Sequence, residues 1–97
     1  LYADHCADCH GRQGQGAPGV YPALAGNPTV TRPDPRNLVL AITQGGFAPA
    51  TAGNPRPYGM PGFDLPHEDL AALATWLRAS WGHHAAPVSA VDALLAR

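Results

Sequence analysis

The stretch Cys6-Ala7-Asp8-Cys9-His10 lies near the start of the chain and decides the expected fold. Two cysteines three positions apart, with a histidine directly after the second, are typical of a c-type haem attachment site. In such a site both thiols bind the porphyrin vinyl groups and the imidazole takes an axial position on the iron. One turn of helix puts both sulfur atoms on one face. We therefore expect Cys6 and Cys9 to hold one haem c covalently and His10 to bind its iron.

Three other uses of a Cys-x-x-Cys pair were weighed against haem attachment. A structural disulfide is one alternative. Half of a zinc site is another, but the sequence has no further cysteines for a second ligand pair. A thioredoxin-like redox motif follows a strand, and no segment rich in valine and isoleucine precedes Cys6. The histidine after the second cysteine favours haem.

Length and composition indicate a small helical fold built around this cofactor. The chain has 97 residues, which we expect to form one domain, 1–97, with an apolar core that is marginal without help. Eleven glycines and eleven prolines favour short helices joined by long irregular loops. We predict an all-α fold whose helices and loops enclose a covalently bound haem.

The charge pattern excludes some classes of partner. The sequence has seven acidic residues, six arginines and no lysine, so its formal net charge is −1. We therefore expect no basic surface for nucleic acid. The longest apolar run, near Leu70 to Leu77, is too short for a transmembrane helix. We expect no direct membrane span and no signal peptide in this chain.

Met60 is the only methionine and the candidate for the second axial ligand. A single methionine usually fills a core. Here it lies fifty residues beyond His10, among glycine, proline and aromatic residues, after a long loop from Phe47 to Gly59. A loop of that length in a small domain is usually functional. We therefore predict that the Met60 thioether binds the iron opposite His10.

Capping and periodicity predict four helical segments. The first covers residues 1–10 and ends at Gly11. The second follows a cap at Asp34, after an irregular stretch 27–36, and ends at Gly45-Gly46. The third covers residues 66–80, and the fourth covers 90–96 after a Ser89 cap. The side chains expected to face the core are Leu70, Leu73, Leu77 and Trp81. We expect Trp76 to pack on Tyr2. Four histidines should be solvated: His5, His67, His83 and His84.

Together with this haem motif and Met60, four further stretches resemble known cytochromes: residues 21–28 (YPALAGNP), 49–53 (PATAG), 58–63 (YGMPGF) and 80–82 (SWG). The chain resembles a class I cytochrome c, and most closely the last haem domain of the cytochrome subunit of membrane-bound alcohol and sugar dehydrogenases. The resemblance implies that the Pro22 carbonyl accepts a hydrogen bond from the second ring nitrogen of His10. It also implies a periplasmic location, or one on the periplasmic face of the bacterial inner membrane.

The chain also departs from that resemblance. Its first helix is short, and it has one haem motif where the dehydrogenase subunit has three. The three explanations are a domain excised from a longer chain, a single-haem relative, and a domain fused to another enzyme.

Side chains that bond the haem propionates are a further expectation, since buried carboxylates need donors. Arg36, Arg56 and Tyr58 are the candidates, and solvated loop positions are the alternative for both arginines.

Two axial protein ligands leave no open position on the iron, so the sequence predicts an electron-transfer protein or domain and not an enzyme. The expected partners are redox proteins: a dehydrogenase as donor, and an oxidase, quinone or other cytochrome as acceptor. Electrons should pass through a small, mostly uncharged patch formed by Ala7, Ala48, Pro49, Pro61 and Gly62. The alternative is a haem domain with a labile Met60 that binds ligands or acts like a peroxidase.

Overall fold

The computed structural model describes residues 1–17, 21–46 and 59–96. In these ranges the elements are helices: α1 (Tyr2–His5), α2 (Ala7–His10), α3 (Pro28–Thr31), α4 (Arg36–Gln44), α5 (His67–Ala79) and α6 (Ala90–Ala96). Two isolated bridges, Ala17 with Tyr21 and Gly46 with Met60, are the extended pairings among the described residues. The all-α class is therefore confirmed, and Arg56 and Tyr58 lie outside the described part.

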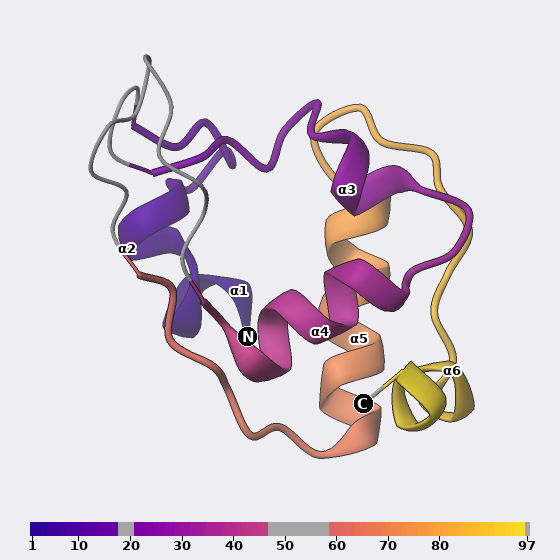
Figure 1. The fold of residues 1–97 in the computed structure, drawn as a ribbon. Helices are drawn as coiled ribbons and strands as arrows, with labels where there is room; N and C mark the ends of the chain where they lie inside the picture. Colours follow the sequence, from indigo (N-terminus) through magenta and orange to yellow (C-terminus); the bar gives the residue numbers. More distant parts are fainter. Residues whose placement is uncertain (18–20, 47–58, 97) are drawn as a thin grey trace.

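Helix α5 is the longest helix and forms the centre of the core (Figure 1). Its leucines Leu70, Leu73 and Leu77 are buried, and they recur at helical spacing, as predicted. Helices α3, α4 and α6 all pack against it. The helix begins one residue later and ends one residue earlier than the range expected from the sequence. No helix in the described ranges is both long and apolar enough to cross a membrane.

Helix α4 lies across α5 and contributes the second buried face. Its residues Leu38, Val39 and Ile42 are buried. The Asp34 carboxylate accepts a hydrogen bond of 3.0 Å from the Arg36 backbone N–H, but the N-cap position is Pro35, so Asp34 lies one residue before the cap position predicted for it. The helix ends at a glycine, Gly45, whose φ of 63° suits a residue without a side chain.

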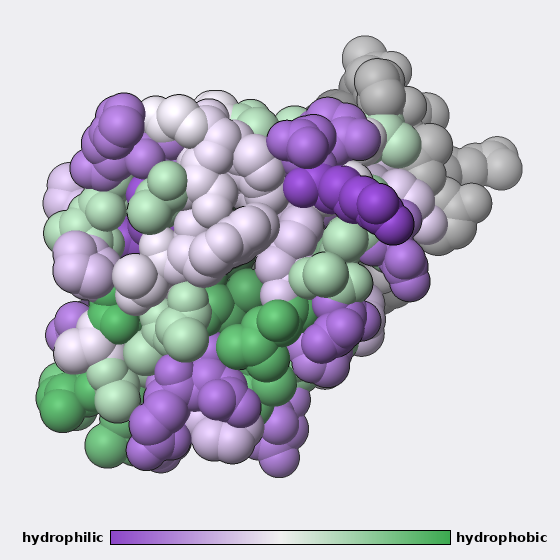
Figure 2. All heavy atoms as spheres, turned by 180° about the vertical axis from the view of Figure 1, so that it is seen from behind, coloured by the Kyte–Doolittle hydropathy of each residue, from purple (hydrophilic) through white to green (hydrophobic). Residues whose placement is uncertain are grey.

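Helix α6 begins with a reciprocal cap. The Asp92 N–H donates to the Ser89 hydroxyl, and the Ser89 N–H donates to the Asp92 carboxylate, as a capping box requires. Ala93 faces the core, whereas Val91 and Leu95 are exposed. In the rear view of Figure 2, apolar side chains gather in the lower half of the surface.

Two segments differ from the expectation. The predicted first helix is two single turns, because Cys6 leaves the helical conformation at φ −121° and separates α1 from α2. The stretch expected to be irregular contains the one-turn helix α3, whose Asn27 side chain accepts from the Thr29 N–H. An asparagine followed by Pro28 is a helix-start signal, and here it forms a cap.

The prediction that His83 is solvated is wrong. Its ring is buried, with 8 % of the residue exposed, and both ring nitrogens have backbone partners. His84 and His5 are exposed, and His67 is half-buried at the start of α5. The sequence argument that neighbouring side chains point apart holds for His83 and His84, but it does not say which one points inward.

Candidate functional site

The two cysteines of the motif lie one turn apart across the break between α1 and α2. Both are free thiols; Cys6 is buried and Cys9 is exposed. Backbone N–H groups of Cys9 and His10 both donate to the Cys6 carbonyl, at 3.3 and 2.9 Å, so the turn that carries the motif is closed by hydrogen bonds. Burial raises the pKa of the Cys6 thiol.

The His10 ring is buried and has a defined orientation. Its Nδ1 lies 2.9 Å from the carbonyl oxygen of Pro22. Because a carbonyl only accepts hydrogen bonds, Nδ1 carries a proton, and in the neutral imidazole the lone pair is then on Nε2. This is the tautomer that a metal ligand needs, with a second partner that fixes the plane of the ring.

The segment that carries Pro22 is held against the motif by backbone bonds. The Gly16 N–H donates to the His10 carbonyl at 2.7 Å, and the N–H groups of Leu24 and Ala25 both donate to the Gly14 carbonyl. A Cβ atom on Gly16 would lie 2.6 Å from the Tyr21 carbonyl oxygen. Glycine is therefore required at position 16, where the loop after the motif lies against the segment that carries Pro22.

Met60 is half-buried and held by its backbone against the end of α4. The Gly46 N–H donates to the Met60 carbonyl at 2.9 Å, and the Met60 N–H donates to the Gly46 carbonyl at 2.7 Å. Three residues on, the Phe63 N–H donates to the Ile42 carbonyl. A Cβ atom on Gly62 would lie 2.5 Å from the Thr43 carbonyl oxygen. The segment after Met60 and the end of α4 therefore leave no room for a side chain at Gly62.

This donor set fits a covalent haem. Two thiols that are not paired with each other, an imidazole with a free Nε2 and a thioether are the groups that attachment and axial ligation use. Arg36 lies exposed at the start of α4, and the other two candidates for the propionates, Arg56 and Tyr58, fall outside the described residues. Of the patch expected to pass electrons, Pro61 and Gly62 are exposed and Ala7 is half-buried, while Ala48 and Pro49 also fall outside.

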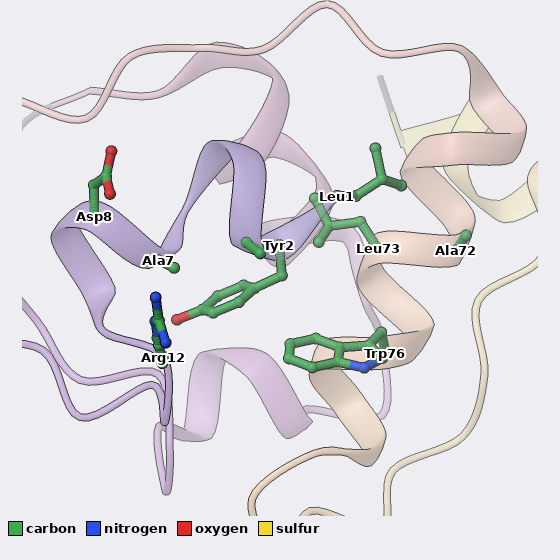
Figure 3. A pocket seen from close by; sticks show the side chains of 9 residues that line it. Leu1, Tyr2, Ala7, Asp8, Arg12, Ala72, Leu73 and Trp76 are labelled. Carbon is green, nitrogen blue, oxygen red and sulfur yellow. The ribbon is translucent and has the colours of Figure 1, made fainter.

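A surface hollow of about 770 Å³ is lined by residues of α1, α2 and α5. Figure 3 shows the Tyr2 ring crossing it beside Trp76, with Arg12 and Asp8 at one end. The Tyr2 and Trp76 ring centroids are 4.9 Å apart, which confirms the predicted packing between the terminal helices. The Tyr2 hydroxyl donates to the Gly11 carbonyl. The lining of this hollow includes neither His10 nor Met60.

Sequence reasoning missed two buried polar side chains that organise this region, His83 and Arg78. The Arg78 residue is 1 % exposed, and its guanidinium donates to three backbone carbonyls. A signal for it existed, because Ala71, Ala74 and Arg78 recur at i, i+3 and i+7 on one face of α5. We found no comparable signal for His83.

Comparisons with known proteins show the family of the chain. Residues 1–81 match the family described as Cytochrome c. The chain is 38 % identical over 95 residues to the alcohol dehydrogenase (quinone) cytochrome c subunit of Gluconobacter oxydans (strain 621H), covering 95 % of this chain and 20 % of that protein. It is 34 % identical over 96 residues to the gluconate 2-dehydrogenase cytochrome c subunit of Pantoea cypripedii, covering 95 % and 22 %. It is 34 % identical over 98 residues to the fructose dehydrogenase cytochrome subunit of Gluconobacter japonicus, covering 93 % and 20 %.

The chain thus spans about a fifth of the length of each of these relatives. The family match covers the cysteine motif, the Pro22 segment, Met60 and α5. On the family match and on the relatives together, the chain belongs to the cytochrome c family.

Proposed function

We propose that this chain is an electron relay whose haem c is attached through Cys6 and Cys9 and ligated by His10 and Met60. The observation that carries the proposal is the His10 ring, which follows two free thiols and has Nδ1 bonded to the Pro22 carbonyl. Haem, when bound, supplies one-electron oxidation and reduction at its iron.

The protein residues hold the two axial positions. Pro22 fixes the His10 ring and strengthens its Nε2 as a donor, because a hydrogen bond from Nδ1–H to a carbonyl raises ligand basicity. Met60 is supported by its double backbone bond to Gly46. With His10 and Met60 both holding the iron, no position would be left on it for a substrate, and the bound haem would supply one-electron transfer.

The partners follow from the relatives, which are named as cytochrome subunits of alcohol, gluconate and fructose dehydrogenases. We propose that this chain accepts electrons from a dehydrogenase or a neighbouring cytochrome, and that it donates to another cytochrome, a quinone or an oxidase. The periplasm, or the periplasmic face of the bacterial inner membrane, is the proposed location. The exposed Pro61 and Gly62 belong to the proposed contact patch.

The test uses the purified haem-loaded protein. In acidified organic solvent the pigment should stay with the polypeptide, and the reduced protein should bind carbon monoxide slowly because both axial positions are filled. Met60→Ala should bind it rapidly, while Leu95→Ala, a truncation of an exposed side chain, should behave as the wild type. Rapid binding by the wild type would contradict the relay and favour the ligand-binding alternative.

A further inference from the structure

We propose that His83 is a positioning residue that tunes the reduction potential through the Pro22 segment, and that its protonation makes the potential depend on pH. This inference rests on the proposed ligation by His10. It gives a function to a buried histidine that lies outside the haem motif.

The two partners of the His83 ring fix its protonation state. Nδ1 lies 2.9 Å from the Leu77 carbonyl, near the end of α5, and Nε2 lies 2.9 Å from the Gly26 backbone nitrogen. The Leu77 carbonyl only accepts, so Nδ1 carries a proton. The Gly26 N–H only donates, so Nε2 must keep its lone pair. The geometry therefore requires a neutral His83.

Gly26 lies in a short turn that begins directly after Pro22. Asn27 closes the turn by donating from its side chain to the Ala23 carbonyl and from its N–H to the Leu24 carbonyl. The chain of contacts runs from α5 through His83 to Gly26, through the turn to Pro22, and from the Pro22 carbonyl to His10. The orientation of the axial imidazole thus depends on a turn that His83 ties to α5.

The two residues before His83 both have a left-handed backbone. Trp81 has φ 52°, a conformation that is unfavourable for a residue with a side chain. Gly82 follows with φ 85°. The Trp81 ring meanwhile covers Gly14, where a Cβ atom would lie 2.7 Å from it. Gly14 is the residue whose carbonyl holds Leu24, so Trp81 and His83 support the same turn from two sides.

Protonation of His83 would place a second N–H against the Gly26 N–H. That hydrogen bond is then lost and the turn loses its tie to α5. A less constrained Pro22 carbonyl makes a weaker bond to His10, which makes the imidazole a poorer donor to ferric iron. The new positive charge also disfavours the ferric state. Both effects raise the reduction potential when His83 is protonated, so we expect a lower potential at higher pH.

Several charged or titratable groups lie on the described elements around His83. Helix α5 carries Arg78 in its last turn and His67, Glu68 and Asp69 in its first turn, at the end away from Leu77. His84 is on the same loop, Tyr21 precedes the turn and Arg32 follows α3. The Arg78 guanidinium is directed at backbone carbonyls. Arginine and tyrosine side chains do not change charge between about pH 5 and pH 8. His84 is therefore the neighbour to control for.

The experiment measures the reduction potential of the haem-loaded protein between about pH 5 and pH 8, the range in which histidines titrate. His83→Gln keeps an amide oxygen that accepts from Gly26 and does not titrate, whereas His83→Leu removes the acceptor. His84→Gln is the matched control, since it removes an exposed histidine one position away. Before the potentials are measured, absorption spectra are recorded to establish that each protein has thioether-attached haem with two axial ligands.

We expect the reduction potentials of the wild type and of His84→Gln to change equally with pH. The change should correspond to at least a factor of three in the ferric to ferrous ratio, which is about 28 mV at 59 mV per tenfold change. His83→Gln should stay near the high-pH value, and His83→Leu, which loses the hydrogen bond but gains no charge, should lie between the high-pH and low-pH values, both without pH dependence. A wild-type shift that survives in His83→Gln, or equal potentials in His83→Gln and His83→Leu, would overturn the inference while leaving the relay intact. Loss of the haem ligands in the wild type itself would overturn both.

Discussion

Replacing Arg78 with methionine should destabilise the protein strongly, although Arg78 lies outside the haem motif. Its guanidinium donates to the carbonyls of Ala86 at 2.7 Å, Val30 at 3.1 Å and Arg32 at 2.5 Å. These bonds tie α5 to the end of α3 and to the loop before α6. Methionine fills much of the same space but donates to none of the three carbonyls.

The size of the loss follows from those bonds. Each hydrogen bond from a charged donor contributes about 1.5–3 kcal/mol. The variant leaves three carbonyls without their donor, at about 1–3 kcal/mol each, but it no longer has to bury a cation, so we expect a net loss of about 3 kcal/mol or more. A domain of this size has a free energy of unfolding of about 5–15 kcal/mol. Arg78→Met should therefore lower the melting temperature by at least about 12 °C, at roughly 4 °C per kcal/mol.

Denaturation of the haem-loaded protein by guanidinium, followed by far-ultraviolet circular dichroism and by haem absorbance, measures this loss. Arg32→Met is the matched control, because the Arg32 side chain is exposed and its backbone carbonyl is unchanged. It should change the free energy of unfolding by less than about 0.5 kcal/mol. A loss below about 1 kcal/mol in Arg78→Met, in excess of the control, would refute the claim that the guanidinium fastens α3 to α5.

Three further outcomes are expected. In Gly62→Ala the new methyl group should push against the Thr43 carbonyl and lower the free energy of unfolding by about 1–3 kcal/mol. Because Met60 is displaced, the long-wavelength absorption band of ferric haem with a methionine ligand should weaken. An unchanged band would contradict the tight approach. Burial raises the pKa of the Tyr2 phenol above its ordinary value, with a further rise from Cys6 while that side chain is a free thiol. The folded state then keeps the proton longer than the unfolded chain, so stability should fall as pH rises above about 10, and Tyr2→Phe should reduce that fall in guanidinium titrations. Electron-transfer rates in stopped flow should change less than about threefold between 50 mM and 500 mM salt, because the chain has no lysine to steer partners; a steep decrease would point to a charged docking surface.

The parts of the fold that could be predicted are those that local physics determines. A Cys-x-x-Cys-His motif has few chemical uses, and the leucines of α5 show a period that only a buried helix face explains. The hydrogen bonds that Asp34 and Ser89 make near helix starts were also predictable, since each residue places a side-chain oxygen next to an N–H group two or three residues on. In each case the partners lie within a few turns of one another in the sequence.

The parts that could not be predicted depend on contacts between distant segments. His83 meets Gly26 across 57 positions, and Arg78 meets Val30 across 48. Both partners are backbone groups, so no side chain in the sequence marks them as acceptors or donors. The break at Cys6 is similar, because turns as short as α1 and α2 are not stable alone and packing decides where they end.

A separation between stability and redox function follows from how the two proposed axial residues are held. His10 is oriented by a carbonyl on a glycine-rich loop, and Met60 by backbone bonds to Gly46, whereas the leucines of α5 form the core. Truncating Leu73 should therefore lower the free energy of unfolding with little change in the iron spectrum. Substitutions at Gly16 or Gly62 should instead change the iron spectrum more than they change the hydrophobic core. They move the backbone that presents a ligand but remove no apolar surface from the core. In this chain the irregular segments determine the electronic properties, and the helices determine whether those segments stay in place.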